Sequence, residues 1–123
     1  MRKNPKATRV ARRAAKAMAA TAGGSKRSGR IAGRAVVQYL REQGMTGRVT
    51  NEDQFKDFKA IGTAAGAEAG SRQYSMKFMK DQGGPVKRRK AIKDAATKGA
   101  ENQSKVSFFR KGGDDNPYMN YRS

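Results

Sequence analysis

The stretch IGTAAGAEAG, residues 61–70, carries a glycine at every fourth position: Gly62, Gly66 and Gly70. Ala65 and Ala69 lie beside them, so a helix here presents almost no side chain along one face. Another backbone can then approach very closely. The row predicts tight helix packing, and we expect the partner to be another protein subunit. Membrane insertion is one alternative, and a weak helix that tolerates each glycine at about 1 kcal/mol is another.

The glycine row belongs to a long helix of roughly thirty residues. Thr50 is a suitable N-cap with Asp53 as its capping-box partner, and the helix should end before Gly83, Gly84 and Pro85. Apolar side chains gather near both ends, with Tyr74, Met76, Phe78 and Met79 at the second. The sequence therefore predicts a protein-packing surface made of Phe55, Phe58, Gly62, Gly66, Gly70 and Phe78.

Charge divides the chain into three parts around this helix. Residues 1–48 hold 13 Lys and Arg and one acidic residue, residues 49–84 hold five of each, and residues 85–123 hold ten and four. We therefore expect a basic arm of two helices, a neutral central helix, and a basic short helix that leads into an extended tail.

The basic arm repeats one design in two helices. The first follows Pro5 and ends at Gly23 and Gly24, with an apolar face of Ala7, Val10, Ala11, Ala14, Ala17 and Met18. Its basic face holds Lys6, Arg9, Arg13 and Lys16. The second runs from near Ser28 to Gly44, with an apolar face of Ile31, Ala32, Ala35, Val36, Tyr39 and Leu40 and a basic face of Arg27, Arg30, Arg34 and Arg41.

A fourth helix is expected from Pro85 to Gly99. It carries the densest basic cluster of the chain, Lys87, Arg88, Arg89, Lys90 and Lys93. Beyond Gly99 the sequence is typical of an extended tail, in which Val106, Phe108 and Phe109 suit pairing with a sheet edge or anchoring in a pocket.

Composition limits how much core the chain can build. Leu, Ile, Val and Phe make up only 15 of the 123 residues, and low apolar content with high net charge is typical of disordered chains. The sequence therefore predicts a mainly α fold of three to four helices with thin apolar faces, glycine hinges, extended basic termini and little autonomous core. We expect full order only inside a larger assembly.

The net charge of +18 indicates a polyanionic partner, and nucleic acid is the first candidate. Arginine exceeds lysine in the basic arm, and its planar fork binds phosphate through paired hydrogen bonds. No motif for reading base sequence is present, so binding should be to backbone and shape. The chain has no Cys and no His, and its acidic residues pair with no nucleophile; we therefore expect no catalysis, metal, cofactor or small-molecule substrate.

Three functions fit these features. The first is a virion-internal or capsid-associated protein of a DNA virus, such as a phage, that neutralises the genome. The second is a ribosomal or ribosome-associated protein that binds rRNA, and the third is a membrane-active delivery protein. Charged residues around the glycine row, including Lys56, Lys59 and Glu68, disfavour the third. Without a signal peptide, we expect synthesis in the host cytoplasm and then residence in a virion or other nucleoprotein particle.

Overall fold

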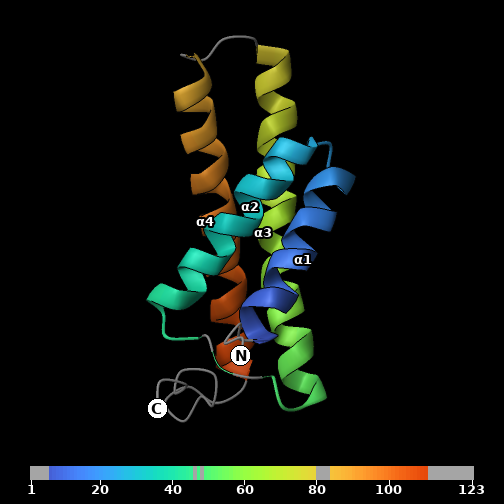
Figure 1. Cartoon of the computed structure of the whole chain (residues 1–123), viewed down its shortest axis with the longest axis vertical. Coiled ribbons are helices and arrows are strands. Elements are labelled where there is room, and N and C mark those ends of the chain that lie inside the picture. Colours follow the sequence, from blue (N-terminus) through green and yellow to red (C-terminus); the bar gives the residue numbers. More distant parts are fainter. Residues whose placement is uncertain (1–5, 46, 48, 80–83, 111–123) are drawn as a thin grey trace, which may run out of the picture.

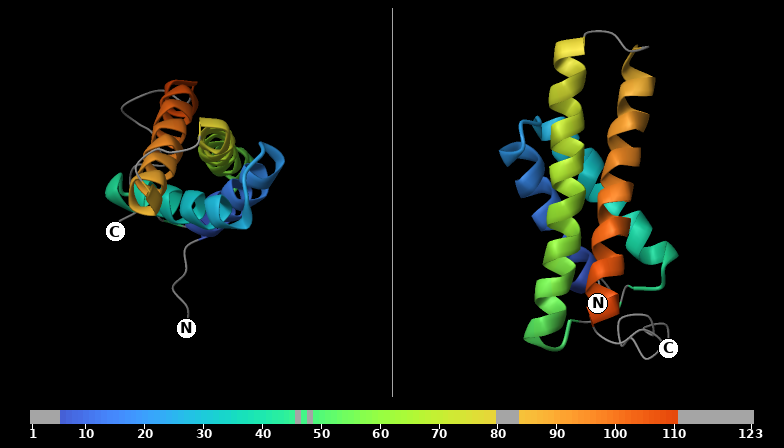
Figure 2. Two further views of the ribbon diagram at one scale, coloured as in Figure 1. Left: turned by 90° about the horizontal axis from the view of Figure 1, so that it is seen from above. Right: turned by 180° about the vertical axis from the view of Figure 1, so that it is seen from behind.

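Four helices form two layers. The computed structural model describes residues 6–45, 47, 49–79 and 84–110, which contain no strand. The helices are α1 (Lys6–Thr21), α2 (Lys26–Glu42), α3 (Glu52–Met79) and α4 (Gly84–Arg110). The long helices α3 and α4 run side by side in opposite directions, and α1 and α2 lie across one side of this pair (Figure 1, Figure 2). The predicted mainly α fold of three to four helices is confirmed.

The turn between α1 and α2 is built by glycine and serine. Gly23 has a φ of 98°, and Gly24 donates its N–H to the Ala19 carbonyl at 2.8 Å, which is the Schellman arrangement that ends a helix. Ser25 then caps α2, because its side chain and that of Ser28 each accept from the backbone N–H of the other. The predicted end of α1 is confirmed, whereas α2 begins slightly before the predicted start at Ser28.

A second Schellman motif ends α2. Gly44 has a φ of 73°, and Met45 donates its N–H to the Leu40 carbonyl at 2.8 Å. The side chains of Met45 and Leu40 are both fully buried, which supplies the apolar contact that accompanies this motif. The predicted end of α2 at Gly44 is confirmed.

Asn51 caps the start of α3. Its Oδ1 accepts the backbone N–H of Gln54 at 2.9 Å. Thr50 instead donates its backbone N–H and its hydroxyl to Oε1 of Gln54, both at 2.8 Å. The prediction that Thr50 is the N-cap is therefore wrong, because the Gln54 amide folds back onto Thr50 and leaves the capping position to Asn51.

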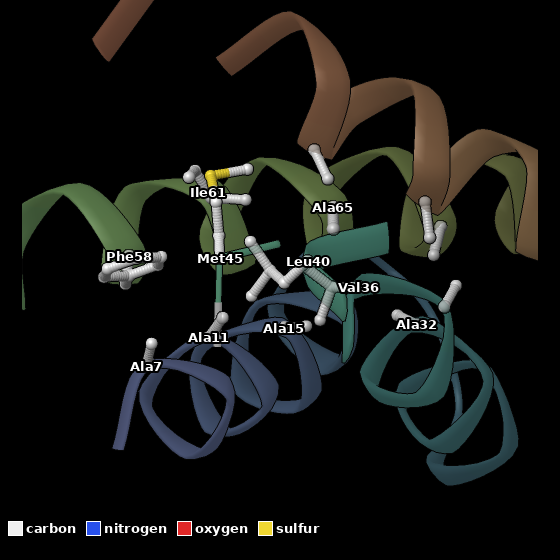
Figure 3. Close-up of a cluster of buried hydrophobic side chains, with 14 of the residues drawn as sticks. Ala7, Ala11, Ala15, Ala32, Val36, Leu40, Met45, Phe58, Ile61 and Ala65 are labelled. Atoms are coloured by element: carbon white, nitrogen blue, oxygen red, sulfur yellow. The ribbon is translucent and has the colours of Figure 1, made fainter. Parts of the chain in front are cut away.

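The core is built mainly from small side chains. One buried cluster contains fifteen residues, nine of which are alanines, and its larger members are Val36, Leu40, Met45, Phe58, Ile61 and Ile92. These side chains point into the space enclosed by α1, α2 and α3, with Ile92 contributed by α4 (Figure 3). The three charge segments of the sequence therefore share one core. The apolar faces are thin, as predicted.

The glycine row packs directly against α1. A Cβ atom added to Gly62, Gly66 or Gly70 would overlap a main-chain carbonyl oxygen of α1, belonging in turn to Ala11, Ala15 and Ala19. Both series ascend together, so α1 and α3 run parallel at this contact. The predicted tight packing is present, and its partner is α1 of the same chain instead of a second subunit.

The buried face of α1 differs from the predicted one. Ala7, Ala11, Ala15 and Ala19 are fully buried, whereas Ala17 of the predicted face is exposed. The reason is the spacing of the partner helix: glycines at every fourth position of α3 select a row of α1 with the same spacing. A helix that packs by its backbone needs only this narrow row.

Helix α4 continues through Gly99. A Cβ atom on Gly99 would overlap the Ala64 carbonyl of α3, so this glycine permits a close helix contact instead of ending the helix. The predicted end at Gly99 and the extended conformation beyond it are therefore wrong up to Arg110. Val106 lies on the helix with its side chain 59% exposed. The side chains of Phe108 and Phe109, and residues 1–5 and 111–123, lie outside the described part of the chain.

Candidate nucleic-acid interface

Positive charge is concentrated in three of the four helices. Together, α1 and α2 hold ten Lys and Arg and a single acidic residue, Glu42. In α4 there are eight basic and two acidic residues, while α3 holds four of each. Helices α1 and α2, which form the layer that covers one side of α3 and α4 (Figure 2), therefore carry a net charge of +9.

A hollow of about 430 Å³ lies between α2 and α4 and is lined by five basic side chains. Ile31, Ala35 and Gln38 form the remaining lining, and no acidic residue takes part. The basic residues are Arg27, Arg30 and Arg34 of α2 with Arg89 and Lys93 of α4. Two predicted basic clusters, more than fifty residues apart in the sequence, therefore meet in one place.

A second hollow, of about 600 Å³, lies on the α1 side of α2. Its basic residues are Arg12 of α1 and Arg34 and Arg41 of α2, and Val37, Gln38 and Glu42 complete the lining. Arg34 and Gln38 line both hollows, so the two adjoin along α2. We call the seven cations of the two hollows the basic strip: Arg12, Arg27, Arg30, Arg34, Arg41, Arg89 and Lys93.

Helix packing places these side chains. Ala32, Val36 and Leu40 are buried on the inner face of α2, and this fixes the arginines of α2 on its outer face. Gly33 of α2 helps to place Arg12 of α1, because glycine has no side chain and leaves room for the aliphatic part of the Arg12 side chain. A Cβ atom on Gly33 would lie 3.0 Å from Cγ of Arg12.

The strip carries a large excess of positive charge, with Glu42 the one acidic residue in the described lining of its two hollows. Within the described residues no carboxylate pairs with any of its seven cations. Ion pairs occur elsewhere on α4, such as Lys90 with Asp94 at 3.4 Å, and these are exposed pairs one helical turn apart. The first hollow also lies beside the first turns of α2, where the helix dipole adds positive potential and no acidic side chain offsets it.

Acidic side chains mark one limit of the strip. A third hollow of about 380 Å³ continues between α2 and α4 and mixes both signs, with Glu42, Asp94 and Glu101 beside Lys93 and Lys98. Tyr39 also lines it, and the Tyr39 hydroxyl lies 2.6 Å from Oγ of Ser104, which joins α2 to α4. Because acidic and basic side chains both line this third hollow, it is less favourable for a polyanion than the strip.

The structure gathers some of the predicted nucleic-acid-binding residues and separates others. Six are in the strip. Five others lie outside its hollows and are at least partly exposed: Arg9, Arg13, Lys16, Lys87 and Lys90. Arg88 is partly buried and its Nε–H has no acceptor among the described residues. The Lys6 side chain lies outside the described side chains.

Arg12 is the basic residue that sequence reasoning missed. Arg12 lies one helical turn before Lys16, which belongs to the predicted basic face of the first helix. The predicted face of Lys6, Arg9, Arg13 and Lys16 did not include Arg12. Only the position of α2 relative to α1 shows that Arg12 adjoins the strip. Gln38, which lines all three hollows, carried no recognisable signal.

The predicted protein-packing residues have different environments. Phe58 is fully buried in the core, and Phe55 is 45% exposed at the start of α3. The side chain of Phe78 lies outside the described side chains. As shown above, Gly62, Gly66 and Gly70 are covered by α1, so Phe55 is the described member of this set that offers an apolar surface to a partner.

Comparisons with protein-family models, with curated proteins and with solved structures find no match for this chain. In the part of the chain that the structure describes, no helix is long and apolar enough to span a membrane. Nor do the described Asp and Glu residues come together in a group of three or more that could bind a metal ion. The basic strip, by its geometry and charge, is therefore the feature of the described residues that indicates a function.

Proposed function

We propose that this protein is a non-enzymatic structural component of a nucleoprotein particle and that it binds nucleic-acid phosphates along the basic strip. One observation carries the proposal: seven cations from three helices converge on two adjoining hollows whose described lining includes one carboxylate, Glu42, and none of the seven forms an ion pair with a described carboxylate. Such an arrangement repels itself unless a polyanion is bound.

The chemistry of the side chains supports phosphate as the ligand. Six of the seven cations are arginines, whose planar guanidinium forks donate paired hydrogen bonds to phosphate oxygens. Lys93 adds a point charge at the edge of the first hollow. Contacts of this kind position a protein on the backbone and carry no base sequence, so we expect binding that is independent of sequence.

The kind of particle is a separate part of the proposal. A virion of a DNA virus, such as a phage, remains our first hypothesis, and the ribosome is the alternative. The glycine row had favoured the virion because it suited docking on a shell protein, but α1 covers that row. The virion hypothesis then rests on the basic charge of the chain, which suits the ribosomal alternative equally well. Membrane delivery had also depended on an accessible glycine row, so we do not propose it.

The phosphate-binding proposal is tested by the salt dependence of affinity. The double variant Arg30→Gln/Arg34→Gln removes two cations of the strip, and Lys56→Gln/Lys59→Gln removes two cations that line a separate hollow on α3. Binding of a labelled DNA duplex would be followed by fluorescence anisotropy over a series of salt concentrations. Each lost duplex phosphate contact should make the negative slope of log K against log salt less steep by about 0.9.

We expect the slope of the strip variant to be less steep than that of the wild type by about 1.8, because two contacts are lost. The α3 variant should keep the wild-type slope. Circular dichroism would establish that both variants retain their helices. Equal slopes in the two variants would contradict the proposal, and so would tight binding of the wild type without salt dependence.

The setting is tested on the native particle. Particles that contain this chain would be separated by gradient centrifugation, treated with DNase or RNase, and their proteins identified by mass spectrometry. Sedimentation with a DNase-sensitive genome and shell proteins would support the virion hypothesis. Sedimentation with rRNA would replace it with the ribosomal alternative.

A further inference from the structure

We propose that the basic strip takes double-stranded nucleic acid, with one phosphate strand lying along α2. This inference rests on the proposed function, because it names the form of nucleic acid that the same site binds. Two features of the strip carry it: the described residues of its lining include no aromatic ring, and four of its seven cations stand in a row on one packed helix, α2.

The lining is the first feature. Proteins that bind single strands without sequence preference stack the bases on aromatic side chains, a contribution of about 1–3 kcal/mol per base. The two hollows of the strip are lined by Arg, Lys, Gln, Glu, Ile, Val and Ala. The adjacent aromatic residue, Tyr39, is partly buried and hydrogen-bonded to Ser104, and Phe55 is on α3. Among the described residues the strip therefore offers cations and no aromatic ring on which a base could stack.

The spacing of the arginines along α2 is the second feature. Helix α2 packs against α1, α3 and α4, so the backbone positions of its four arginines are held at a set spacing, and their side chains are exposed. Arg27 and Arg41 are fourteen residues apart, which corresponds to about 21 Å along the helix. A duplex holds its phosphates in place in advance, whereas a single strand must be ordered on binding, and here no base stacking offsets that entropy.

The length of the strip sets a scale for the duplex. The axis of B-DNA advances by about 3.4 Å per base pair, so about 21 Å corresponds to roughly six base pairs of duplex length. Flanking cations on α1 and α4 then lie to either side of the α2 row, within reach of the same strand or the one across the groove. We expect affinity per site to level off once the duplex exceeds about eight base pairs.

The experiment compares binding of the full chain to four probes of equal length: DNA duplex, RNA duplex and the two corresponding single strands. Anisotropy titrations would be run at one fixed salt concentration, with the Arg30→Gln/Arg34→Gln variant beside the wild type. We expect at least about tenfold tighter binding of a duplex than of either single strand, and loss of this preference in the variant. Whichever duplex binds more tightly identifies the source of the double strand.

Single strands that bind as tightly as duplexes, with affinity reduced in the strip variant, would overturn the duplex inference while leaving phosphate binding by the strip intact. Absence of binding to all four probes would instead contradict the proposed function itself. Hairpins with a closed stem of about four base pairs that bind as tightly as long duplexes would also overturn the inference.

Discussion

Glycine has three distinct uses in this chain, and they differ in what a methyl group would meet. At Gly62, Gly66 and Gly70 a Cβ atom would overlap the backbone of α1, which leaves nothing flexible to move aside. At Gly44 a side chain would meet open space but an unfavourable φ of 73°. At Gly29 the backbone is helical and the nearest atom would be 3.4 Å away, an ordinary van der Waals contact.

Gly66→Ala should therefore destabilise the protein. The added methyl group forces α1 away from α3, and overpacking of this kind costs about 1–3 kcal/mol. Gly29→Ala is the matched control, because it adds the same methyl group to α2 where there is room, and replacing helical glycine by alanine gains up to about 1 kcal/mol. Urea denaturation of both variants would compare their free energies of unfolding. Equal stability of the two would show that α1 does not pack on the glycine row.

Tyr39 makes stability depend on alkaline pH. Burial raises the pKa of its hydroxyl above the usual 10.0, the hydrogen bond to Ser104 opposes this, and the Glu101 carboxylate adds to the rise. The folded state thus disfavours ionisation more than the unfolded state does. The stability linked to Tyr39 is complete below the unfolded pKa of 10.0 and is lost as the pH rises through the folded value.

Tyr39→Phe should be less stable than the wild type near neutral pH, by about 0.5–1.5 kcal/mol for the lost hydrogen bond. Ser104 keeps its bond to the Glu101 carbonyl at 2.9 Å, so no donor is left without a partner. The difference between the two proteins should shrink above the usual tyrosine pKa, because only the wild type loses stability when Tyr39 ionises. Urea titrations at about pH 8 and about pH 11 measure this. A difference that stays constant would contradict the account.

At the scale of the helices, local chemistry determines the ends. Sequence reasoning located the ends of α1 and α2 because Gly23 and Gly44 follow apolar-periodic segments, and both adopt positive φ angles. It misplaced the cap of α3 by one residue because Thr50 and Asn51 are both good caps, and the choice depends on where the Gln54 side chain goes.

Asn51→Ala should destabilise α3 by about 0.5–2 kcal/mol, the usual range for removing an N-cap. Thr50→Ala removes one hydroxyl bond to Gln54 and leaves the backbone bond of Thr50 in place, so its effect should be smaller. Thermal unfolding followed by circular dichroism gives both values. A larger loss of stability in Thr50→Ala than in Asn51→Ala would show that Thr50 is the N-cap of α3.

Gly99 illustrates what the sequence could not provide for α4. Glycine after an amphipathic segment is usual at a helix end, and the segment beyond it lacks a clear helical period. The helix continues because Gly99 faces the Ala64 carbonyl of α3 across a close contact. That reason is tertiary, since only the position of α3 distinguishes a glycine that ends a helix from one that lets two helices meet.

At the scale of the whole molecule, composition predicted the kind of core that the chain builds. Few large apolar residues indicated little core, and the core is indeed mostly alanine, yet four helices pack around it. The close approach of the helices compensates for the scarcity of large apolar side chains. Glycine and alanine let the helix backbones come together, so main-chain atoms supply contact area that a count of large side chains does not include. The basic faces were predictable from helical spacing, but their convergence between α2 and α4 depended on the packing of the helices.

The excess positive charge should make stability depend on salt. Raising the salt concentration from about 0.01 M to about 0.15 M shortens the Debye length from about 30 Å to about 8 Å and screens repulsion among the cations. We therefore expect Tm to rise across this range. The Arg30→Gln/Arg34→Gln variant should show a smaller rise, because it begins with less repulsion. A Tm that falls with salt would indicate that attractive ion pairs dominate.

The most direct test of the central claim is to map the bound nucleic acid on the protein by NMR. A DNA duplex would be titrated into the ¹⁵N-labelled chain, and changes in backbone amide shifts would be followed residue by residue. We expect the largest changes in α2 between Arg27 and Arg41 and in α4 around Arg89 and Lys93, with little change in residues 56–67 of α3. Changes centred on residues 56–67, with α2 unaffected, would contradict this expectation.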